Sequence, residues 1–310
     1  MIKAKNLTKR YGDKTAVDDL SFTVEPGKVT GFLGPNGAGK STTMPLLLGL
    51  DRPHGGNATI EGRHYQDLPQ PLRVVGALLE AKAVHTGRSA YNHLLCLAHT
   101  QGIGTKRVDE VLTLVGLHDV ARKRAGGFSL GMGQRLGLAA ALLGDPSVVI
   151  LDEPVNGLDP EGIVWIRTLM KQLAAEGRTV FVSSHLMNEM AVTAEHLIVI
   201  GRGRLVADSS TEEFIERSTE QTVLVRSPDS AGLSEAIALE GGKVTPNGTG
   251  ELTVANMEAA RIGEIAAAGG FVLYEVSPRR GSLEEAFMEL TRETVEYGAA
   301  PTTDNQGGAA

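Results

Sequence analysis

Cysteine is nearly absent from this sequence. Cys96 is the only cysteine in 310 residues, which excludes an intramolecular disulfide. The N-terminus also lacks the pattern of a secretory signal, in which a basic segment precedes an apolar one and a cleavage site. These two absences favour a reducing compartment, and we expect the protein in the cytoplasm.

Long apolar runs are missing as well. The longest, at 44–50 and 136–143, end at Asp51 and Asp145. Both are far shorter than the ~20 apolar residues that a membrane-spanning helix needs. If this protein helps to move a compound across a membrane, another polypeptide must supply the path.

The sequence also lacks an excess of basic residues. The chain has 30 Lys and Arg against 37 Asp and Glu, a formal net charge of −7. Non-specific nucleic-acid binding relies on a cationic surface, so we expect no nucleic acid among the partners. The contents of hydrophobic (42%) and charged (22%) residues are near globular averages, which predicts a folded chain.

The first two-thirds of the chain alternates short apolar runs with helical stretches. This pattern predicts an α/β fold with a mostly parallel sheet. We expect buried strands at 28–33, 148–151 and 179–183, a hairpin of strands at 196–200 and 204–208, and a short helix at 211–217. Helical periodicity interrupts the strand pattern from about residue 83, which indicates an inserted helical subdomain.

The rhythm changes after residue 218. We expect strands at 222–226, 242–245, 251–254 and 271–276 and helices at 231–239 and 257–268. Their βαββαβ order predicts a small α+β, ferredoxin-like accessory domain. Ser282 and Glu285 have the spacing of a capping box and open a final helix, and the tail at 298–310 is expected to be disordered.

Residues 34–41 (GPNGAGKS) fill every fixed position of the Walker A pattern, directly after a predicted strand. Glycines let such a loop turn its backbone N–H groups toward phosphate oxygens, and the following helix adds its positive N-terminal end. The residues expected at the phosphates are Gly34, Pro35, Asn36, Gly37, Ala38, Gly39, Lys40, Ser41 and Thr42. Lys40 is expected at the β- and γ-phosphates and Ser41 at Mg²⁺. Pro45 lies inside the predicted helix and removes a backbone donor there, so a kink is possible.

Two carboxylates follow the apolar run 148–151. In the sequence VVILDE, Asp152 and Glu153 have the arrangement of a Walker B acid and a catalytic glutamate. Asp152 would orient Mg²⁺ and Glu153 would polarise the attacking water as a general base. Taken alone, the motif is equally compatible with a strand that ends in a solvated acidic turn.

The segment 128–135 (FSLGMGQR) decides which P-loop family fits best. It resembles the signature of ABC ATPases, with Ser129 and Gly131 at the central serine and glycine and Leu130 where glycine is more usual. Further elements follow in the family's order: NGLD at 156–159 resembles its D-loop, and VSSH at 182–185 places His185 at its switch histidine. Tyr11 stands at the adenine-stacking aromatic, and Glu80 at a position where the family usually has Gln.

The resemblance covers residues 1–217 and is closest to ATPase subunits of drug and bacteriocin exporters. It implies an ABC cassette at 1–218 with a helical subdomain at about 83–135, followed by an accessory domain at 219–297. It also implies that ATP and Mg²⁺ bind, that Lys40, Glu153 and His185 are catalytic, and that Ser41, Glu80 and Asp152 lie at the metal. Ser129, Gly131 and Asp159 would contact ATP across a head-to-tail dimer with a second copy or a paralogue.

The implied function is ATP hydrolysis that energises an exporter, with separate permease subunits, at the cytoplasmic face of the membrane. Two other hypotheses remain open at this point. One is a soluble ABC ATPase whose C-terminal domain senses a regulatory ligand. The other is an ABC ATPase that acts on DNA or ribosomes, which the single Walker A motif and the lack of a sustained heptad run disfavour.

Overall fold

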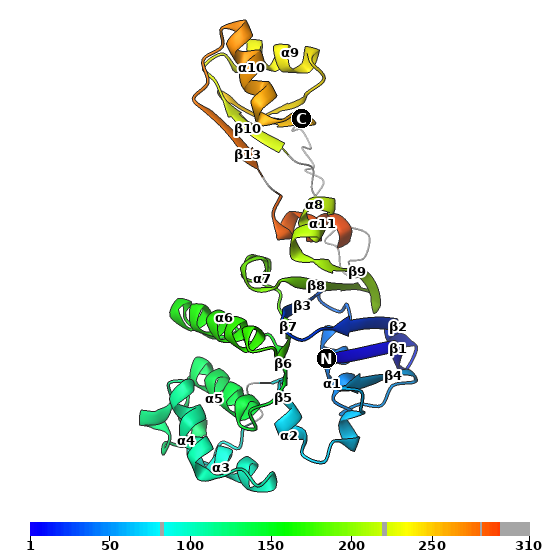
Figure 1. The fold of residues 1–310 in the computed structure, drawn as a ribbon, viewed down its shortest axis with the longest axis vertical. Helices are drawn as coiled ribbons and strands as arrows, with labels where there is room; N and C mark the ends of the chain where they lie inside the picture. The colour runs from blue at the N-terminus through cyan, green and yellow to red at the C-terminus, as the bar shows by residue number, and fades with distance from the viewer. Residues whose placement is uncertain (81–83, 219–221, 280, 292–310) are drawn as a thin grey trace, which may run out of the picture.

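The computed structural model describes residues 1–80, 84–218, 222–279 and 281–291. Two groups of elements are visible in Figure 1: an N-terminal part (residues 1–218) and a C-terminal module (residues 222–279). The tail predicted at 298–310 lies outside the described residues.

A six-stranded sheet forms the centre of the N-terminal part, in the order β5-β6-β7-β3-β8-β9. Its strands are β3 (Val29–Leu33), β5 (Val75–Leu78), β6 (Val148–Asp152), β7 (Thr179–Ser183), β8 (His196–Gly201) and β9 (Arg204–Ser210). All neighbours pair in parallel except β8 and β9, which form an antiparallel hairpin. The predicted mostly parallel sheet and hairpin are confirmed.

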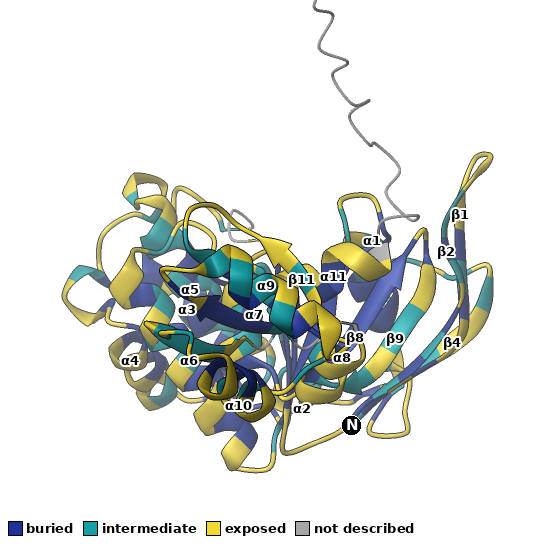
Figure 2. Cartoon of the chain, turned by 90° about the horizontal axis from the view of Figure 1, so that it is seen from above, coloured by how far each residue is buried: buried dark blue, intermediate teal, exposed yellow. Residues whose placement is uncertain are grey.

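Both faces of the inner strands of this sheet (β6, β7, β3 and β8) are buried. In β7, Val180 and Val182 belong to a core shared with the helices, whereas Phe181 points into a second core on the opposite face. Such two-sided burial explains why these strands are continuous apolar runs without alternation. Figure 2 shows the same distribution, with burial concentrated on the strands and on the inner faces of the helices.

A second, antiparallel sheet covers one face of the first. It contains β1 (Ile2–Tyr11), β2 (Lys14–Val24) and β4 (Gly55–Ile60) in the order β2-β1-β4. Phe22 of β2 stacks on Phe181, with ring centroids 5.7 Å apart. The sequence analysis did not predict this sheet.

Helices cover the other face of the central sheet, whereas the helix that follows β3 packs in the second core with the antiparallel sheet (Figure 1). The helices of the N-terminal part are α1 (Lys40–Leu47), α2 (Pro71–Val74), α3 (Ala90–Thr100), α4 (Thr105–Leu114), α5 (Leu130–Leu142), α6 (Pro160–Ala175), α7 (Met187–Thr193) and α8 (Thr211–Ser218). Short 3₁₀ turns lie at Tyr65–Asp67, His118–Val120 and Ala125–Gly127. Helix α1 continues through Pro45 and ends two residues later, so the proline does not break it.

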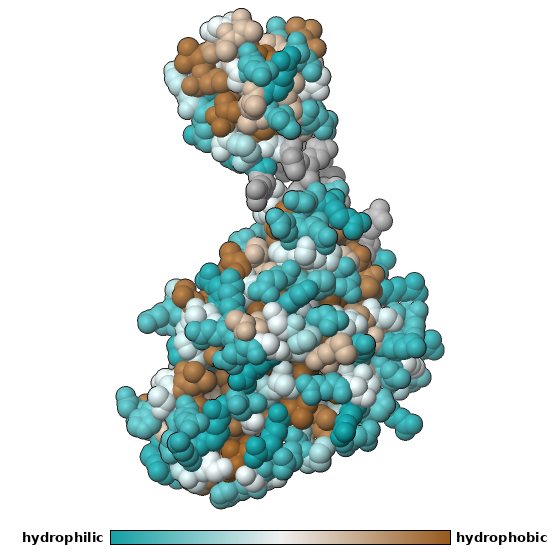
Figure 3. Space-filling view, in the orientation of Figure 1, coloured by the Kyte–Doolittle hydropathy of each residue, from teal (hydrophilic) through white to brown (hydrophobic). Residues whose placement is uncertain are grey.

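Within the described ranges, no helix combines the length and the apolar composition that crossing a bilayer requires. Figure 3 shows a surface on which apolar side chains form small groups among polar ones.

The C-terminal module has the predicted βαββαβ order. Its elements are β10 (Thr222–Arg226), α9 (Ser230–Leu239), β11 (Lys243–Pro246), β12 (Glu251–Ala255), α10 (Ala259–Gly269) and β13 (Glu275–Arg279). The strands form an antiparallel sheet in the order β11-β12-β10-β13, and the module has an apolar core of its own. This is the strand order of a ferredoxin-like fold.

The last strand of the module differs from the prediction, which placed it at 271–276. Strand β13 is Glu275–Arg279 and includes Pro278. Proline is tolerated because β13 is an edge strand, where a missing N–H donor need not leave a neighbouring strand unpaired. The apolar run at 271–273 is the basis of the predicted bounds. Its residues Phe271 and Leu273 pack on the core of the module without joining the sheet.

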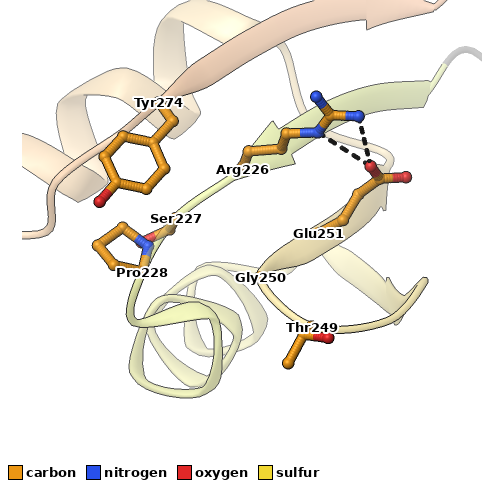
Figure 4. A pocket seen from close by; sticks show the side chains of 7 residues that line it. All are labelled: Arg226, Ser227, Pro228, Thr249, Gly250, Glu251 and Tyr274. Atoms are coloured by element: carbon orange, nitrogen blue, oxygen red, sulfur yellow. Dashed lines mark hydrogen bonds and ion pairs between the residues drawn. The ribbon is translucent and has the colours of Figure 1, made fainter.

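One side of the module carries an open hollow of about 500 Å³, which lies between Tyr274 and the pair of Arg226 and Glu251 (Figure 4). The guanidinium of Arg226 is bound by Glu251 at 2.9 Å and by Glu275 at 3.4 Å. The positive charge in the hollow is therefore already compensated by two carboxylates.

Helix α11 (Leu283–Thr291) follows the module but packs on the N-terminal part. It contacts α8 and α7, and its side chains Leu283, Ala286 and Phe287 belong to the larger core beside the central sheet. The predicted capping box is present: Glu285 N donates to Ser282 Oγ at 3.1 Å, and Ser282 N donates to Glu285 Oε2 at 2.9 Å. The sequence analysis had grouped this helix with the accessory domain at 219–297.

The packing of α11 leads to a stability prediction. Phe287 is buried, and Phe287→Ala should destabilise the protein by about 3 kcal/mol, because the lost ring leaves a cavity between α11 and the N-terminal part. Chemical unfolding followed by circular dichroism would measure the change. Met288→Ala on the same helix is the matched control, because Met288 is 62% exposed and should cost almost nothing. Equal stabilities of the two variants would contradict the observed packing of α11.

Candidate functional site

The loop between β3 and α1 is shaped by glycines. Gly39 is the N-cap of α1 and has φ 107°, a conformation that costs other residues energy. A Cβ added at Gly39 would lie 2.5 Å from the carbonyl oxygen of Ala16. Only glycine therefore lets the loop pass this close to the backbone of β2.

Lys40 is held inside this loop. The residue is 8% exposed. Its ammonium group donates to the carbonyl oxygens of Gly34 and, at 3.2 Å, Pro35. Burial lowers the pKa of Lys40, and the carboxylates of Glu153 and Asp152 oppose this by favouring the charged form. The ammonium group can thus bind an anion, which would replace the carbonyl oxygens of Gly34 and Pro35 as its partner.

The loop opens on a cavity of about 360 Å³. It is lined by Tyr11, Lys14, Ala16, Pro35, Asn36, Gly37, Ala38, Gly39, Lys40, Ser41, Thr42, Asp152 and Glu153. The structure thus brings together the predicted phosphate loop, the predicted aromatic and both predicted acids.

Tyr11 stands at the rim of the cavity and is 52% exposed. Its hydroxyl donates to Asp51 Oδ2 at 2.5 Å, and the ammonium of Lys9 lies 5.0 Å from its ring centroid. The hydrogen bond to Asp51 is the main reason that the pKa of Tyr11 is raised. The tether fixes the position of the ring while its exposed surface remains available for stacking.

The acid pair is positioned by strand register. Asp152 at the end of β6 pairs with Ser183 at the end of β7, and the Ser183 hydroxyl donates to the Asp152 carboxylate. Glu153 N donates to Ser183 Oγ at 3.1 Å and to Ser183 O at 3.2 Å. A single buried serine therefore anchors both acidic residues.

Glu153 and His185 contact each other directly. His185 Nδ1 lies 2.7 Å from Glu153 Oε2, and His185 N donates to the same oxygen at 3.3 Å. The carboxylate thus stands between the histidine and the cavity, where it can accept a proton from a water molecule.

Ser41 and Asp152 both line the cavity and contribute oxygen atoms, one of a hydroxyl and the other of a carboxylate. Mg²⁺ prefers such hard oxygen ligands, completed by water and phosphate oxygens. Within the described part of the chain, no group of three or more His, Cys, Asp or Glu could hold a metal by itself. Glu80, which was also predicted at the metal, follows β5, is exposed and is not among the residues that line the cavity.

The remaining predicted residues form a second group outside the cavity. Ser129 is the exposed N-cap of α5 and accepts from Met132 N at 3.3 Å. Asp159 is the N-cap of α6 and accepts from Gly162 N at 3.0 Å. A Cβ at Gly131 would lie 2.8 Å from Gly157 O, so the tip of α5 touches the loop that leads to α6.

Leu130, where the family more often has glycine, also packs on this loop. A Cβ at Gly157 would lie 2.4 Å from Leu130 Cγ. The leucine is therefore accommodated by the absence of a side chain at residue 157.

Sequence reasoning missed four contributors to the site: Ser183, Gln134, Asp51 and Ala16. Ser183 and Gln134 lie inside segments that were quoted for His185 and Ser129, but their partners are distant in sequence. Asp51 acts through its hydrogen bond from Tyr11, and Ala16 through the close approach of its carbonyl oxygen to Gly39. Neither contact leaves a local sequence pattern.

Comparisons with known proteins agree on one family. A family model described as "ABC transporter" matches residues 17–156, and a second model, described as a domain of unknown function, matches residues 221–284. An uncharacterized ABC transporter ATP-binding protein of Bacillus subtilis, YhcH, is 38% identical over 302 residues, which cover 96% of this chain and 97% of that protein. The bacitracin transport ATP-binding protein BcrA of Bacillus licheniformis is 42% identical over 221 residues, 70% of this chain and 72% of that one.

A solved structure adds a dimer to these comparisons. It is a dimeric, post-hydrolysis ATP-binding cassette bound to ADP and Pi, with a TM-score of 0.62 and 26% identity. The match covers 68% of this chain and 99% of that chain.

The geometry of the acid pair leads to a prediction for Glu153→Gln. The amide cannot accept the proton of the attacking water, so the rate of ATP hydrolysis should fall roughly 10²- to 10⁴-fold while ATP still binds. Phosphate release and binding of a fluorescent ATP analogue would measure the two properties. Glu161→Gln, an exposed change in the first turn of α6, is the control. Hydrolysis by Glu153→Gln at the rate of this control would exclude Glu153 as the base.

Proposed function

The chain belongs to the ABC transporter family as an ATP-binding subunit, and from this membership we propose that it hydrolyses ATP to drive an exporter. The observation that carries the proposal is the shared cavity of Tyr11, the phosphate loop, Asp152 and Glu153. The match to a bacitracin transport ATP-binding protein supports transport over a soluble ATPase with a ligand-sensing C-terminal domain.

We propose the following roles at this cavity. The adenine stacks on Tyr11, and the backbone from Gly34 to Thr42 together with Lys40 binds the phosphates. Glu153 accepts the proton of the attacking water, and His185 holds this carboxylate and contacts the γ-phosphate. Ser41 and Asp152 would hold Mg²⁺, which would neutralise charge on the phosphate oxygens.

The second group completes the site in trans. Ser129, Gly131 and Asp159 do not line the cavity of their own chain. The exposed N-terminus of α5 has backbone N–H groups and a positive dipole end, which suit the γ-phosphate held by a partner subunit. The dimeric relative supports a head-to-tail pair, either of two copies or with a paralogue.

We propose that ATP links the two subunits because its γ-phosphate contacts both of them. Hydrolysis removes this shared ligand and favours the open dimer, since closure is stabilised only by the preference of ATP for the closed state. Glu80 and the helices α3 to α5 pass the opening to permease subunits in the membrane, with this chain at the cytoplasmic face.

Dimerisation provides a test that does not require the membrane partner. In a Glu153→Gln background, ATP should convert monomers into dimers, and Ser129→Arg should abolish this because the side chain blocks the helix tip. Light scattering after size-exclusion chromatography would measure the mass. Ser89→Arg is the matched control, since Ser89 is also a helix N-cap and accepts from Asn92 N at 3.2 Å. ATP-dependent dimers of the Ser129→Arg chain would contradict the composite site.

The proposed partner requires a separate experiment. Purification from membranes under mild detergent should recover a hydrophobic polypeptide in a fixed ratio to this chain, and ATP hydrolysis should change when that polypeptide is present. Recovery of the chain alone, with hydrolysis indifferent to membranes, would contradict a transport role.

A further inference from the structure

Gln134 is a buried polar side chain on the apolar side of α5. It is 3% exposed, and its buried neighbours on the helix are leucines and alanines. Its Nε2 donates to the backbone carbonyl oxygen of Glu153 at 3.2 Å. The direction of the amide is fixed by chemistry, because a flipped amide would place two oxygens against each other.

Glu153 has a backbone that needs such support. Its φ is 50°, in the left-handed region that non-glycine residues seldom adopt and that persists only where the surrounding structure holds it. Its N–H donates to Ser183 Oγ, and its C=O accepts from Gln134 Nε2 and, at 3.2 Å, from Asn156 N. Of the two donors to this C=O, Gln134 is the one that belongs to α5. These bonds hold the backbone on both sides of Cα, while His185 Nδ1 contacts the carboxylate itself.

The same helix carries the tip that faces the partner subunit. Ser129 caps α5, and Gly131 touches Gly157 in the loop between Glu153 and α6. Helix α5 therefore contacts the segment 153–159 at two places, once through the Gln134 amide and once through the glycine pair. The glycine pair is a close steric contact, and the amide is a hydrogen bond, so both link the position of α5 to that of this segment.

We propose that Gln134 is a positioning residue for the hydrolysis step. It sets the direction of the Glu153 carboxylate from the helix whose tip, Ser129, contacts the ATP of the partner subunit. The proposal rests on the function proposed above. Gln134 is not among the residues that line the cavity, so its effect should fall on turnover within the closed dimer and not on ATP binding or dimer formation.

Gln134→Met tests this role, because methionine has nearly the same length but no donor. The expected result is a kcat about tenfold lower, with unchanged KM and, in the Glu153→Gln background, unchanged ATP-dependent dimerisation. Leu138→Val on the same helix is the packing control, since Leu138 is equally buried and makes no bond to Glu153. It should lower the melting temperature at least as much as Gln134→Met and leave kcat unchanged.

A double variant separates positioning from a general structural effect. If Gln134 acts through the Glu153 carboxylate, Gln134→Met should cause no further loss of single-turnover hydrolysis in a Glu153→Gln chain. A further tenfold loss there, or an unchanged kcat in the single variant, would overturn the proposal.

These variants also show whether a negative result concerns the role of Gln134 alone or the proposed function as a whole. Absence of ATP hydrolysis in the wild-type chain, together with absence of the Glu153→Gln dimer, would overturn the proposed function. If both are present, a negative result for Gln134→Met overturns only the role of Gln134.

Discussion

The register between β6 and β7 fixes where the two acidic side chains of the site lie. It places Asp152 beside Ser183, while Ser183 also lies opposite Phe32 of β3, the strand that leads into the phosphate loop. Because the strands are parallel, their carboxyl ends meet at one edge of the sheet. A slip by one residue would turn Ser183 and its anchoring hydroxyl to the opposite face. The strand register thus fixes where the carboxylates lie, and the glycine loop after β3 holds Lys40 beside them.

Much of this arrangement could be predicted from the sequence, where the determinants are local. The glycine spacing of the phosphate loop and the β-branched runs of β6 and β7 reflect requirements of the residues themselves. The capping box of α11 is equally local, and both of its hydrogen bonds are present. The position of α11 on α7 and α8 could not be predicted, because the same apolar stripe would serve equally well against the sheet of the C-terminal module.

The missed features share a physical cause. Ser183 and Gln134 act on Glu153 across separations of 30 and 19 residues, and their side chains have no periodicity to reveal this. The antiparallel sheet of β1, β2 and β4 was missed because its strands have irregular pairing, with register shifts between Ala4 and Arg10. Where bulges interrupt a strand, the alternation of buried and exposed residues is lost.

The packing of α11 has a mechanical consequence. The C-terminal module is connected to the N-terminal part at both ends, through α8 before it and α11 after it. Helices α8 and α11 contact each other, so the chain leaves the N-terminal part and returns to it at neighbouring points. A movement of the module therefore bears on this one pair of helices. Through α11 it acts on α7, the helix that begins two residues after His185.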